Sequence, residues 1–289
     1  MKILVTGANG QLGSEFKQLS NKVEYQFIFS DREDLDISDL NQVKQFFSQR
    51  SFDIILNCAA YTAVDNAEEE IELANKINHV GVKNLILACQ KHSIGLIHFS
   101  TDYVFSGDKP SPYRESDHVS PRSVYGKSKS AGEAEILKSN ISALIIRTSW
   151  LYSFYGSNFV KSMIKLGKER ESLKVVFDQI GSPTNAYDLA LATLSCIDQS
   201  SKWKNTQGIY HYSNEGVASW YDFALQIFEN CNIKIKVTPV RSEDYPTKAP
   251  RPSYSVLDKT KFKQDFQISI NHWKNSLNQL DFRNLIQNT

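Results

Sequence analysis

Cysteine is scarce in this chain, and so are long apolar runs. The four cysteines, at positions 58, 89, 196 and 231, are widely spaced and form no Cys-x-x-Cys pair, which argues against a disulfide framework or a thiolate metal site. No stretch approaches the roughly 20 apolar residues that cross a bilayer, and the apolar run at the N-terminus is too short for a secretory signal. We therefore expect a cytoplasmic protein whose thiols are reduced.

The chain also has almost no net charge. Its 33 lysines and arginines balance 32 aspartates and glutamates, which leaves a formal charge of +1 over 289 residues. Such a balance provides no field that would gather nucleic acid or an anionic membrane, although local basic groups can still serve one anionic ligand. We expect a small-molecule partner, with no nucleic acid and no membrane.

Short apolar runs alternate with helical patterns along the chain. The apolar runs cover residues 3–5, 27–29, 54–56, 96–99, 144–146 and 175–177. Helical patterns lie near residues 11–20, 39–50, 78–92, 125–139 and 157–171. Strands that are apolar on both faces and alternate with helices are typical of a doubly wound parallel sheet. The sequence therefore predicts an α/β, Rossmann-like fold.

The composition changes after about residue 150, where aromatic residues and prolines become frequent. We expect residues 1–150 to form the dinucleotide-binding domain, completed by segments near 173–200, and residues 151–289 to form mainly a smaller substrate-binding lobe. No internal repeat or low-complexity tract separates the two parts. A cleft between them is the expected place for a substrate.

A glycine-rich turn follows the first predicted strand and opens the first predicted helix, with the spacing G-x-x-G-x-x-G. Glycines there allow a sharp bend, a close approach of backbone N–H groups to a pyrophosphate, and tight packing of helix on strand. The positive end of the helix then meets the phosphate charge. The residues predicted to contact a dinucleotide at this turn are Gly7, Asn9, Gly10, Gln11, Leu12 and Gly13.

The end of the second predicted strand bears on the identity of the dinucleotide. Asp31 can accept hydrogen bonds from an adenosine ribose, while Arg32 can instead attract a 2′-phosphate, so the choice between NADH and NADPH stays open. Asp36 and Ile37 suit a loop edge against adenine. The three charged residues would equally suit a solvated loop.

The third predicted strand ends in small residues. Ala59 and Ala60 stand at the carboxyl edge, where open α/β sheets bind ligands, and would let the nicotinamide ribose lie against the backbone. Cys58 is interpreted as a small core thiol, because no base lies near it in the sequence.

Tyr125 and Lys129 stand four residues apart, so a helix places both on one face. A free phenol has a pKa of about 10, and a neighbouring cation favours the phenolate, so we expect Lys129 to lower the pKa of Tyr125. Thr101 lies at the carboxyl end of the preceding predicted strand and can direct its hydroxyl to the same carbonyl oxygen. This arrangement predicts that Tyr125 is the proton donor in the reduction of a ketone. On an arbitrary helix, the same spacing would be only an exposed aromatic residue and a solvated lysine.

Taken together, these motifs resemble the dTDP-4-dehydrorhamnose reductases, a family of extended short-chain dehydrogenases/reductases. The similarity spans nearly the whole chain and rests on residues 6–13, 57–65, 100–105, 125–129, 147–150, 181–184 and 251–252. The resemblance implies reduction of the C4 ketone of dTDP-4-dehydro-6-deoxy-L-mannose to dTDP-L-rhamnose with NADPH or NADH.

The resemblance also implies residue roles. The catalytic set would be Thr101, Tyr125 and Lys129. Tyr61 would join the cofactor contacts, and Arg251 would pair with the nucleotide diphosphate of the dTDP-sugar, although a surface ion pair is an equal alternative for it. The remaining substrate contacts would be Thr62, Val64, Thr101, Asp102, Tyr103 and Trp150, the last by stacking on a sugar face or else as a core residue.

One departure from the family pattern concerns a metal. The similarity among some members of the family suggests that acidic side chains hold a metal between their subunits, and Glu15 fits that pattern. Tyr187, however, stands at the second acidic position. We therefore predict no metal, and the chain is expected to be a monomer or a homodimer.

Three other functions stay open on the sequence. The fold is similar to a non-catalytic, dinucleotide-binding regulatory subunit, although that reading does not explain the presence of both Tyr125 and Lys129. The second alternative is a sugar-nucleotide dehydratase or epimerase. Dehydratases of this superfamily resemble one another in carrying Thr-Asp-Glu, whereas this chain has Thr101-Asp102-Tyr103, without the glutamate. The third alternative is a reductase of another 4-keto sugar nucleotide.

Overall fold

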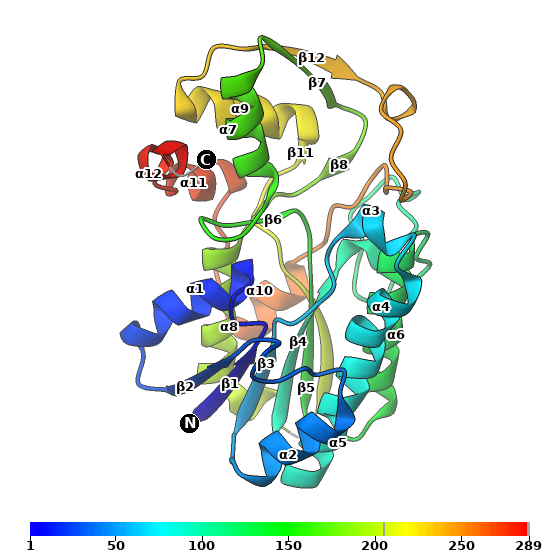
Figure 1. The fold of residues 1–289 in the computed structure, drawn as a ribbon, viewed down its shortest axis with the longest axis vertical. Helices are drawn as coiled ribbons and strands as arrows, with labels where there is room; N and C mark the ends of the chain where they lie inside the picture. Colours follow the sequence, from blue (N-terminus) through cyan, green and yellow to red (C-terminus); the bar gives the residue numbers. More distant parts are fainter. Residues whose placement is uncertain (205, 288–289) are drawn as a thin grey trace.

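A parallel sheet of six strands forms the centre of the computed structural model, which describes residues 1–204 and 206–287 (Figure 1). The strand order is β10-β5-β4-β3-β1-β2, and every pairing within the sheet is parallel. The order reverses between β1 and β3, which makes a crevice at their carboxyl ends. The strands are β1 (Lys2–Thr6), β2 (Gln26–Ser30), β3 (Ile54–Asn57), β4 (Gly95–Thr101), β5 (Ala143–Thr148) and β10 (Gln207–His211).

Helices cover both faces of this sheet because its inner strands are apolar on both. Ile3 and Val5 pack in the core shared with α1 (Gln11–Leu19) and α8 (Ala186–Asp198). Leu4, on the opposite face, packs in the core shared with α2 (Leu40–Ser48), α5 (Gly81–His92) and α6 (Val124–Lys138). The predicted α/β, doubly wound fold is confirmed.

A smaller lobe lies beyond the carboxyl edge of the sheet, at the top of Figure 1. Its core joins aromatic and aliphatic side chains from α7 (Phe159–Glu169), α9 (Trp220–Cys231), α11 (Trp273–Asn278) and α12 (Phe282–Gln287). The parallel pair β7 (Ser172–Val176) and β12 (Lys236–Val240) packs against these helices.

The apolar run 175–177 therefore differs from the other five. It ends β7, which pairs with β12 in the lobe and has no partner in the central sheet among the described residues. The sixth place in the sheet belongs to β10, whose sequence Gln-Gly-Ile-Tyr-His is mostly half-buried at an edge and therefore lacks a continuous apolar run.

Short elements connect these parts. The remaining helices are α3 (Val64–Ala67), α4 (Ile71–Asn75) and α10 (Thr260–Phe266), with single turns η1 (Ser20–Lys22), η2 (Lys76–Val80), η3 (Asp102–Val104), η4 (Ser200–Lys202) and η5 (Ser242–Asp244). The remaining strands are β6 (Leu151–Tyr152), β8 (Ile180–Gly181), β9 (Thr184–Asn185) and β11 (Ala218–Ser219). Among the helices of the described residues, none is both long enough and apolar enough to cross a membrane.

A buried ion pair fixes α6 to the sheet. Arg147 on β5 donates from Nη2 to Oε2 of Glu133 on α6 (2.6 Å) and from Nε to Oε1 (2.9 Å). The two side chains are 1% and 3% exposed. The Arg147 guanidinium also lies 5.0 Å from the centre of the Phe105 ring. Because both charges are withdrawn from water, each depends on the other for compensation.

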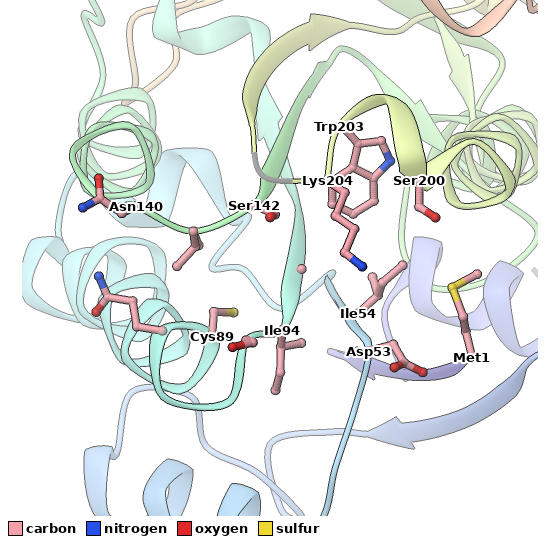
Figure 2. A pocket seen from close by; sticks show the side chains of 14 residues that line it. Met1, Asp53, Ile54, Cys89, Ile94, Asn140, Ser142, Ser200, Trp203 and Lys204 are labelled. Carbon is pink, nitrogen blue, oxygen red and sulfur yellow. The ribbon is translucent and has the colours of Figure 1, made fainter.

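A hollow also exists at the opposite, amino-terminal edge of the sheet, with a volume of about 480 Å³ (Figure 2). Its walls come from Met1, Asp53 and Ile54, from Cys89 in the last turn of α5, from Ile94 after that helix, and from Trp203. The Nε1 of Trp203 donates to the Cys196 carbonyl oxygen (3.0 Å). Open parallel sheets bind ligands at their carboxyl edge. We therefore place the candidate functional site at the other end of the strands.

Replacement of Glu133 by glutamine is expected to destabilise the protein strongly. Glu133→Gln leaves the Arg147 guanidinium buried without a counter-ion, so the free energy of unfolding should fall by about 3 kcal/mol in urea denaturation. Glu69→Gln is the matched control, because Glu69 and Lys248 form an ion pair with side chains 67% and 57% exposed, and its effect should stay within about 1 kcal/mol. Equal losses in the two variants would contradict the structural role of the buried pair.

Candidate active site

Two adjoining hollows open at the carboxyl edge of the sheet. The first hollow, of about 420 Å³, lies between the turn at Gly7 and Gly10 and the ends of β2 and β3. The second hollow, of about 550 Å³, lies between the end of β4, the start of α6 and the loop that follows β5. Gly10, Cys58 and Ala60 belong to the walls of both, so the two hollows form one cleft.

The turn beside the first hollow has no room for side chains. Gly7 has a left-handed φ of 63°, and a Cβ there would lie 2.6 Å from the backbone nitrogen of Ala59. A Cβ on Gly13 would lie 2.5 Å from the carbonyl oxygen of Gly7. No side chain caps the N-terminus of α1, whose N-cap is Gly10. This bare turn at a helix N-terminus fits the pyrophosphate of a dinucleotide.

The predicted adenosine contacts surround the first hollow. Asp31 accepts hydrogen bonds from the Asn9 side chain and from the backbone N–H of Glu33 (2.9 Å). Arg32 lies 3.7 Å from Asp36, Nε to Oδ2, with its side chain 72% exposed, so this ion pair holds the guanidinium only weakly. The predicted contacts that line the hollow are Gly7, Asn9, Gly10, Asp31, Arg32, Asp36, Ile37, Ala59 and Ala60.

Thr101, Tyr125 and Lys129 come together in the second hollow. The hydroxyl of Ser123 accepts from the backbone N–H of Gly126 (3.1 Å) and so begins α6, which places Tyr125 and Lys129 one turn apart. A Cβ on Gly126 would lie 2.2 Å from the Tyr103 carbonyl oxygen, so the glycine lets this end of α6 approach the chain that follows β4. Gln11 and Leu12 line the same hollow.

Lys129 is a buried cation at the wall of the cleft. Its side chain is only 2% exposed, and Nζ donates to the carbonyl oxygen of Phe99 (2.6 Å). Burial lowers the pKa of Lys129 to about 8, against the opposing effects of Glu133 and Cys58. Lys129 therefore remains mostly protonated at neutral pH but loses its proton at a lower pH than an exposed lysine does.

The pKa of Tyr125 differs from the sequence expectation. We expected Lys129 to lower it, whereas burial raises the pKa of Tyr125 to about 12, with a smaller opposing effect from the Thr101 hydroxyl and a further rise caused by Asp102. Desolvation of the phenolate therefore sets the direction of the shift, and the expected lowering by Lys129 is not among its causes. In this state Tyr125 retains its proton, which suits a proton donor.

Most predicted substrate contacts also line the second hollow: Thr62, Val64, Asp102, Tyr103 and Trp150. The Tyr103 ring meets that of Tyr125 edge to face, with centroids 5.6 Å apart. Trp150 has a left-handed φ of 48° and stacks on Trp220 at 3.5 Å, so one face of its indole is already covered.

Asp102 places a carboxyl group in the same wall with little access to water. It is 2% exposed, and its Oδ1 accepts from the Thr101 hydroxyl (3.0 Å). Burial raises the pKa of Asp102 to about 6, although hydrogen bonds from Ser255 and Thr101 oppose the change. At neutral pH the carboxylate is therefore charged in an unfavourable place.

Besides Gly13, which packs against the glycine turn, two predicted residues lie outside both walls as the structure describes them. Arg251 forms a bidentate ion pair with Asp65, with 2.7 Å between Nη2 and Oδ2 and 3.2 Å between Nη1 and Oδ1. The hydroxyl of Tyr61 donates to Glu70 (2.8 Å), while its backbone exchanges hydrogen bonds with Asn78. Contact of either with a ligand stays a prediction.

Other residues of the second hollow were missed in the sequence analysis, among them Ser100, Thr148, Ser149 and Asn158. The hydroxyl oxygens of Ser100 and Thr148 are buried and have no hydrogen-bond partner within the described part of the chain. Buried polar atoms are normally paired, so these two hydroxyls are unsatisfied groups of residues that line the hollow. Their positions at the carboxyl ends of β4 and β5 were the signal that would have identified them.

The region around Glu15 is also polar but bears no cluster of ligands. Glu15 is 3% exposed and accepts from the Ser153 hydroxyl (2.5 Å), and burial raises its pKa. The hydroxyl of Tyr187 accepts from Lys22 (3.2 Å). Over residues 1–204 and 206–287, no group of three or more His, Cys, Asp or Glu side chains could hold a metal ion.

Comparison with known proteins identifies the family. The family model described as RmlD substrate binding domain matches residues 1–283. The chain is 40% identical to a dTDP-4-dehydrorhamnose reductase of Aggregatibacter actinomycetemcomitans, over 96% of this chain and 98% of the relative.

Two solved structures are similar over nearly their whole length. A dTDP-4-dehydrorhamnose reductase from Clostridium acetobutylicum has a TM-score of 0.92 and 44% identity, over 99% of this chain and 100% of that one. The reductase from Bacillus anthracis, solved in complex with NADP, has a TM-score of 0.89 and 41% identity, over 100% of this chain and 99% of that one. The resemblance expected from the sequence is therefore confirmed, and the chain belongs to the dTDP-4-dehydrorhamnose reductase family.

Proposed function

We propose that this protein reduces the C4 ketone of dTDP-4-dehydro-6-deoxy-L-mannose to dTDP-L-rhamnose with NADPH or NADH, in the cytoplasm. The observation that carries the proposal is the convergence of Thr101, Tyr125 and Lys129 in a hollow that continues into the glycine-turn hollow. The names of the family relatives and the NADP complex of the Bacillus anthracis reductase support it.

The roles follow from where the groups lie. A dinucleotide with its adenosine in the first hollow would extend toward the second hollow, and its nicotinamide would supply the hydride for C4 of the sugar. Tyr125 gives its phenolic proton to the ketone oxygen, so that the carbonyl becomes a secondary alcohol, and then recovers a proton from solvent. Thr101 donates to the same oxygen as charge develops on it. Lys129 holds the ribose hydroxyls and stabilises the transient phenolate.

The substrate is held by groups around this centre. The unpaired hydroxyls of Ser100 and Thr148 and the carboxyl of Asp102 bind sugar hydroxyls in the second hollow. Arg251 exchanges Asp65 for the nucleotide diphosphate, which offers the same bidentate geometry. We propose that no metal takes part and that the protein acts as a monomer or a homodimer.

A direct assay tests the function. With dTDP-4-keto-L-sugar generated by the upstream enzymes, the purified protein should consume NADPH or NADH, followed in parallel by nicotinamide absorbance, and form dTDP-L-rhamnose. The alternatives give other outcomes. Cofactor binding without turnover would favour a regulatory subunit. Turnover of only a different 4-keto sugar nucleotide would assign the protein to that substrate instead.

Tyr125→Phe should lower kcat by about 10²–10⁴, because it removes the proton donor and leaves the ring in place. Dissociation constants for NADPH and NADH should change little, as measured by fluorescence titration. Tyr25→Phe is the matched control, since Tyr25 precedes β2 at the opposite edge of the sheet and bonds to Asp198; it should turn over normally. Near-normal turnover by Tyr125→Phe would remove Tyr125 from the mechanism.

Asp102→Asn should stabilise the protein while weakening substrate binding. The native carboxyl has its pKa raised from 3.8 to about 6, so the contribution of this group to stability is fully present below pH 3.8, where both folded and unfolded forms are protonated, and is lost as pH rises through 6. That difference corresponds to about 3 kcal/mol. The variant should therefore exceed the native protein in urea unfolding at pH 7.5 and match it near pH 4, whereas equal stability at both pH values would contradict the buried charge.

A further inference from the structure

A row of buried polar side chains crosses the sheet beneath the cleft. Thr6, Asn57 and His98 occupy paired positions on β1, β3 and β4, so they lie side by side on one face. They are 1%, 1% and 0% exposed. Two residues earlier on the same strands, the face is wholly apolar. A polar row inside such a core is costly unless its groups satisfy one another.

The row ends at the cation of the candidate active site. Thr6 Oγ1 donates to Asn57 Oδ1 (2.8 Å), and Asn57 Nδ2 lies 3.0 Å from His98 Nδ1. His98 Nε2 in turn lies 3.4 Å from Lys129 Nζ. The proposed mechanism uses Lys129, but nothing in it yet uses the imidazole behind it.

Donor and acceptor chemistry couples this row to the charge of Lys129. Burial lowers the pKa of His98 well below its usual range, with a further contribution from Lys129, so the ring is neutral and carries one proton. An ammonium has only donors, so it requires Nε2 as an acceptor, which places the proton on Nδ1. A half-turn of the Asn57 amide then presents its oxygen to Nδ1 and its nitrogen to the Thr6 hydroxyl, so each of these contacts again pairs a donor with an acceptor. With Asn57 as described above, Nε2 carries the proton and matches a neutral amine.

Few other ionisable groups face this cation. Within the described residues they are Glu133 on α6, Cys58 after β3 and His98 on β4, while Tyr125 on α6 lines the same hollow as Lys129. Glu133 already pairs with Arg147. His98 is therefore the neighbour that both touches Nζ and changes its hydrogen bonding with the protonation of Lys129.

We propose that His98 is a positioning residue for Lys129: its Nε2 accepts a hydrogen bond from the ammonium, and a half-turn of the Asn57 amide beside Thr6 accommodates the tautomer that this requires. The ammonium is then held at the wall of the cleft. Two of its N–H groups bind the Phe99 carbonyl and His98, and the third is directed to the ligand. This inference rests on the proposed function only in assigning Lys129 to the cofactor ribose.

Two conservative variants separate positioning from packing. The amide of Gln reaches the place of Nε2 in histidine, whereas the amide of Asn reaches only that of Nδ1. His98→Gln therefore keeps a hydrogen-bond acceptor for Lys129. His98→Asn keeps the contact with Asn57 but loses the contact with Lys129. Leu96→Ala, two residues earlier on the same strand and face, is the control for loss of packing alone.

The measurement is the pH dependence of NADPH and NADH binding, followed by fluorescence titration between pH 6 and 9. Loss of the acceptor lowers the pKa of Lys129 further, so the alkaline limb of affinity for His98→Asn should move down by about one to two pH units. At pH 8, where about half of the native Lys129 is protonated, the affinity of the variant should be about 5–50-fold weaker. His98→Gln and Leu96→Ala should keep the native profile.

Several outcomes would overturn the inference. A native pH profile in His98→Asn, or the same shift in His98→Gln, His98→Asn and Leu96→Ala, would show that His98 serves packing only. Circular dichroism and thermal unfolding check that each variant is folded. If His98→Asn does not fold, loss of the native profile in His98→Gln would still contradict the proposal. Because binding needs no sugar nucleotide, failure of the native protein to reduce the 4-keto sugar would refute the proposed function and leave this test readable.

Discussion

Desolvation of Lys129 is the constraint on which the rest of the site depends. An ammonium this deeply buried keeps its charge only if several neighbours compensate it. The Phe99 carbonyl does so directly, and His98 lies on the side away from the cleft. The position of α6, which carries Lys129, is fixed in turn by the Glu133–Arg147 pair and by the close approach at Gly126. The chemistry of the cleft is therefore set by polar contacts inside the sheet–helix interface.

The site holds several groups in states that a folded protein ordinarily avoids. Ser100 and Thr148 have buried hydroxyl oxygens without partners, Asp102 has a carboxylate with little access to water, and Trp150 has a left-handed backbone conformation. Each reduces stability, and all lie on the wall of one hollow. Such clustering is typical of ligand sites, where the bound molecule supplies the missing interactions.

The sequence predicted those features that follow from local pattern. The strands β1 to β5 were predictable because each carries an apolar run, and Tyr125 and Lys129 because helical spacing alone places them together. The edge strand β10 was not predictable, since its half-buried residues form no continuous apolar run. The apolar run at the end of β7 was misleading, because a strand in the core of the lobe is as apolar as a strand of the central sheet. The raised pKa of Tyr125 and the contact of His98 with Lys129 depend on burial and on register across strands, which no single segment encodes.

The path of the chain links the two parts of the molecule more closely than a boundary at residue 150 suggests. After leaving the sheet through β6 and α7, the chain returns as α8, which covers the face of β1 beside α1, and again as β10, which closes the edge beside β5. A fragment ending at residue 150 would expose apolar surface on one face and an unpaired edge on β5. The nucleotide-binding half therefore depends on residues synthesised after part of the lobe, so its folding can be completed only late in translation.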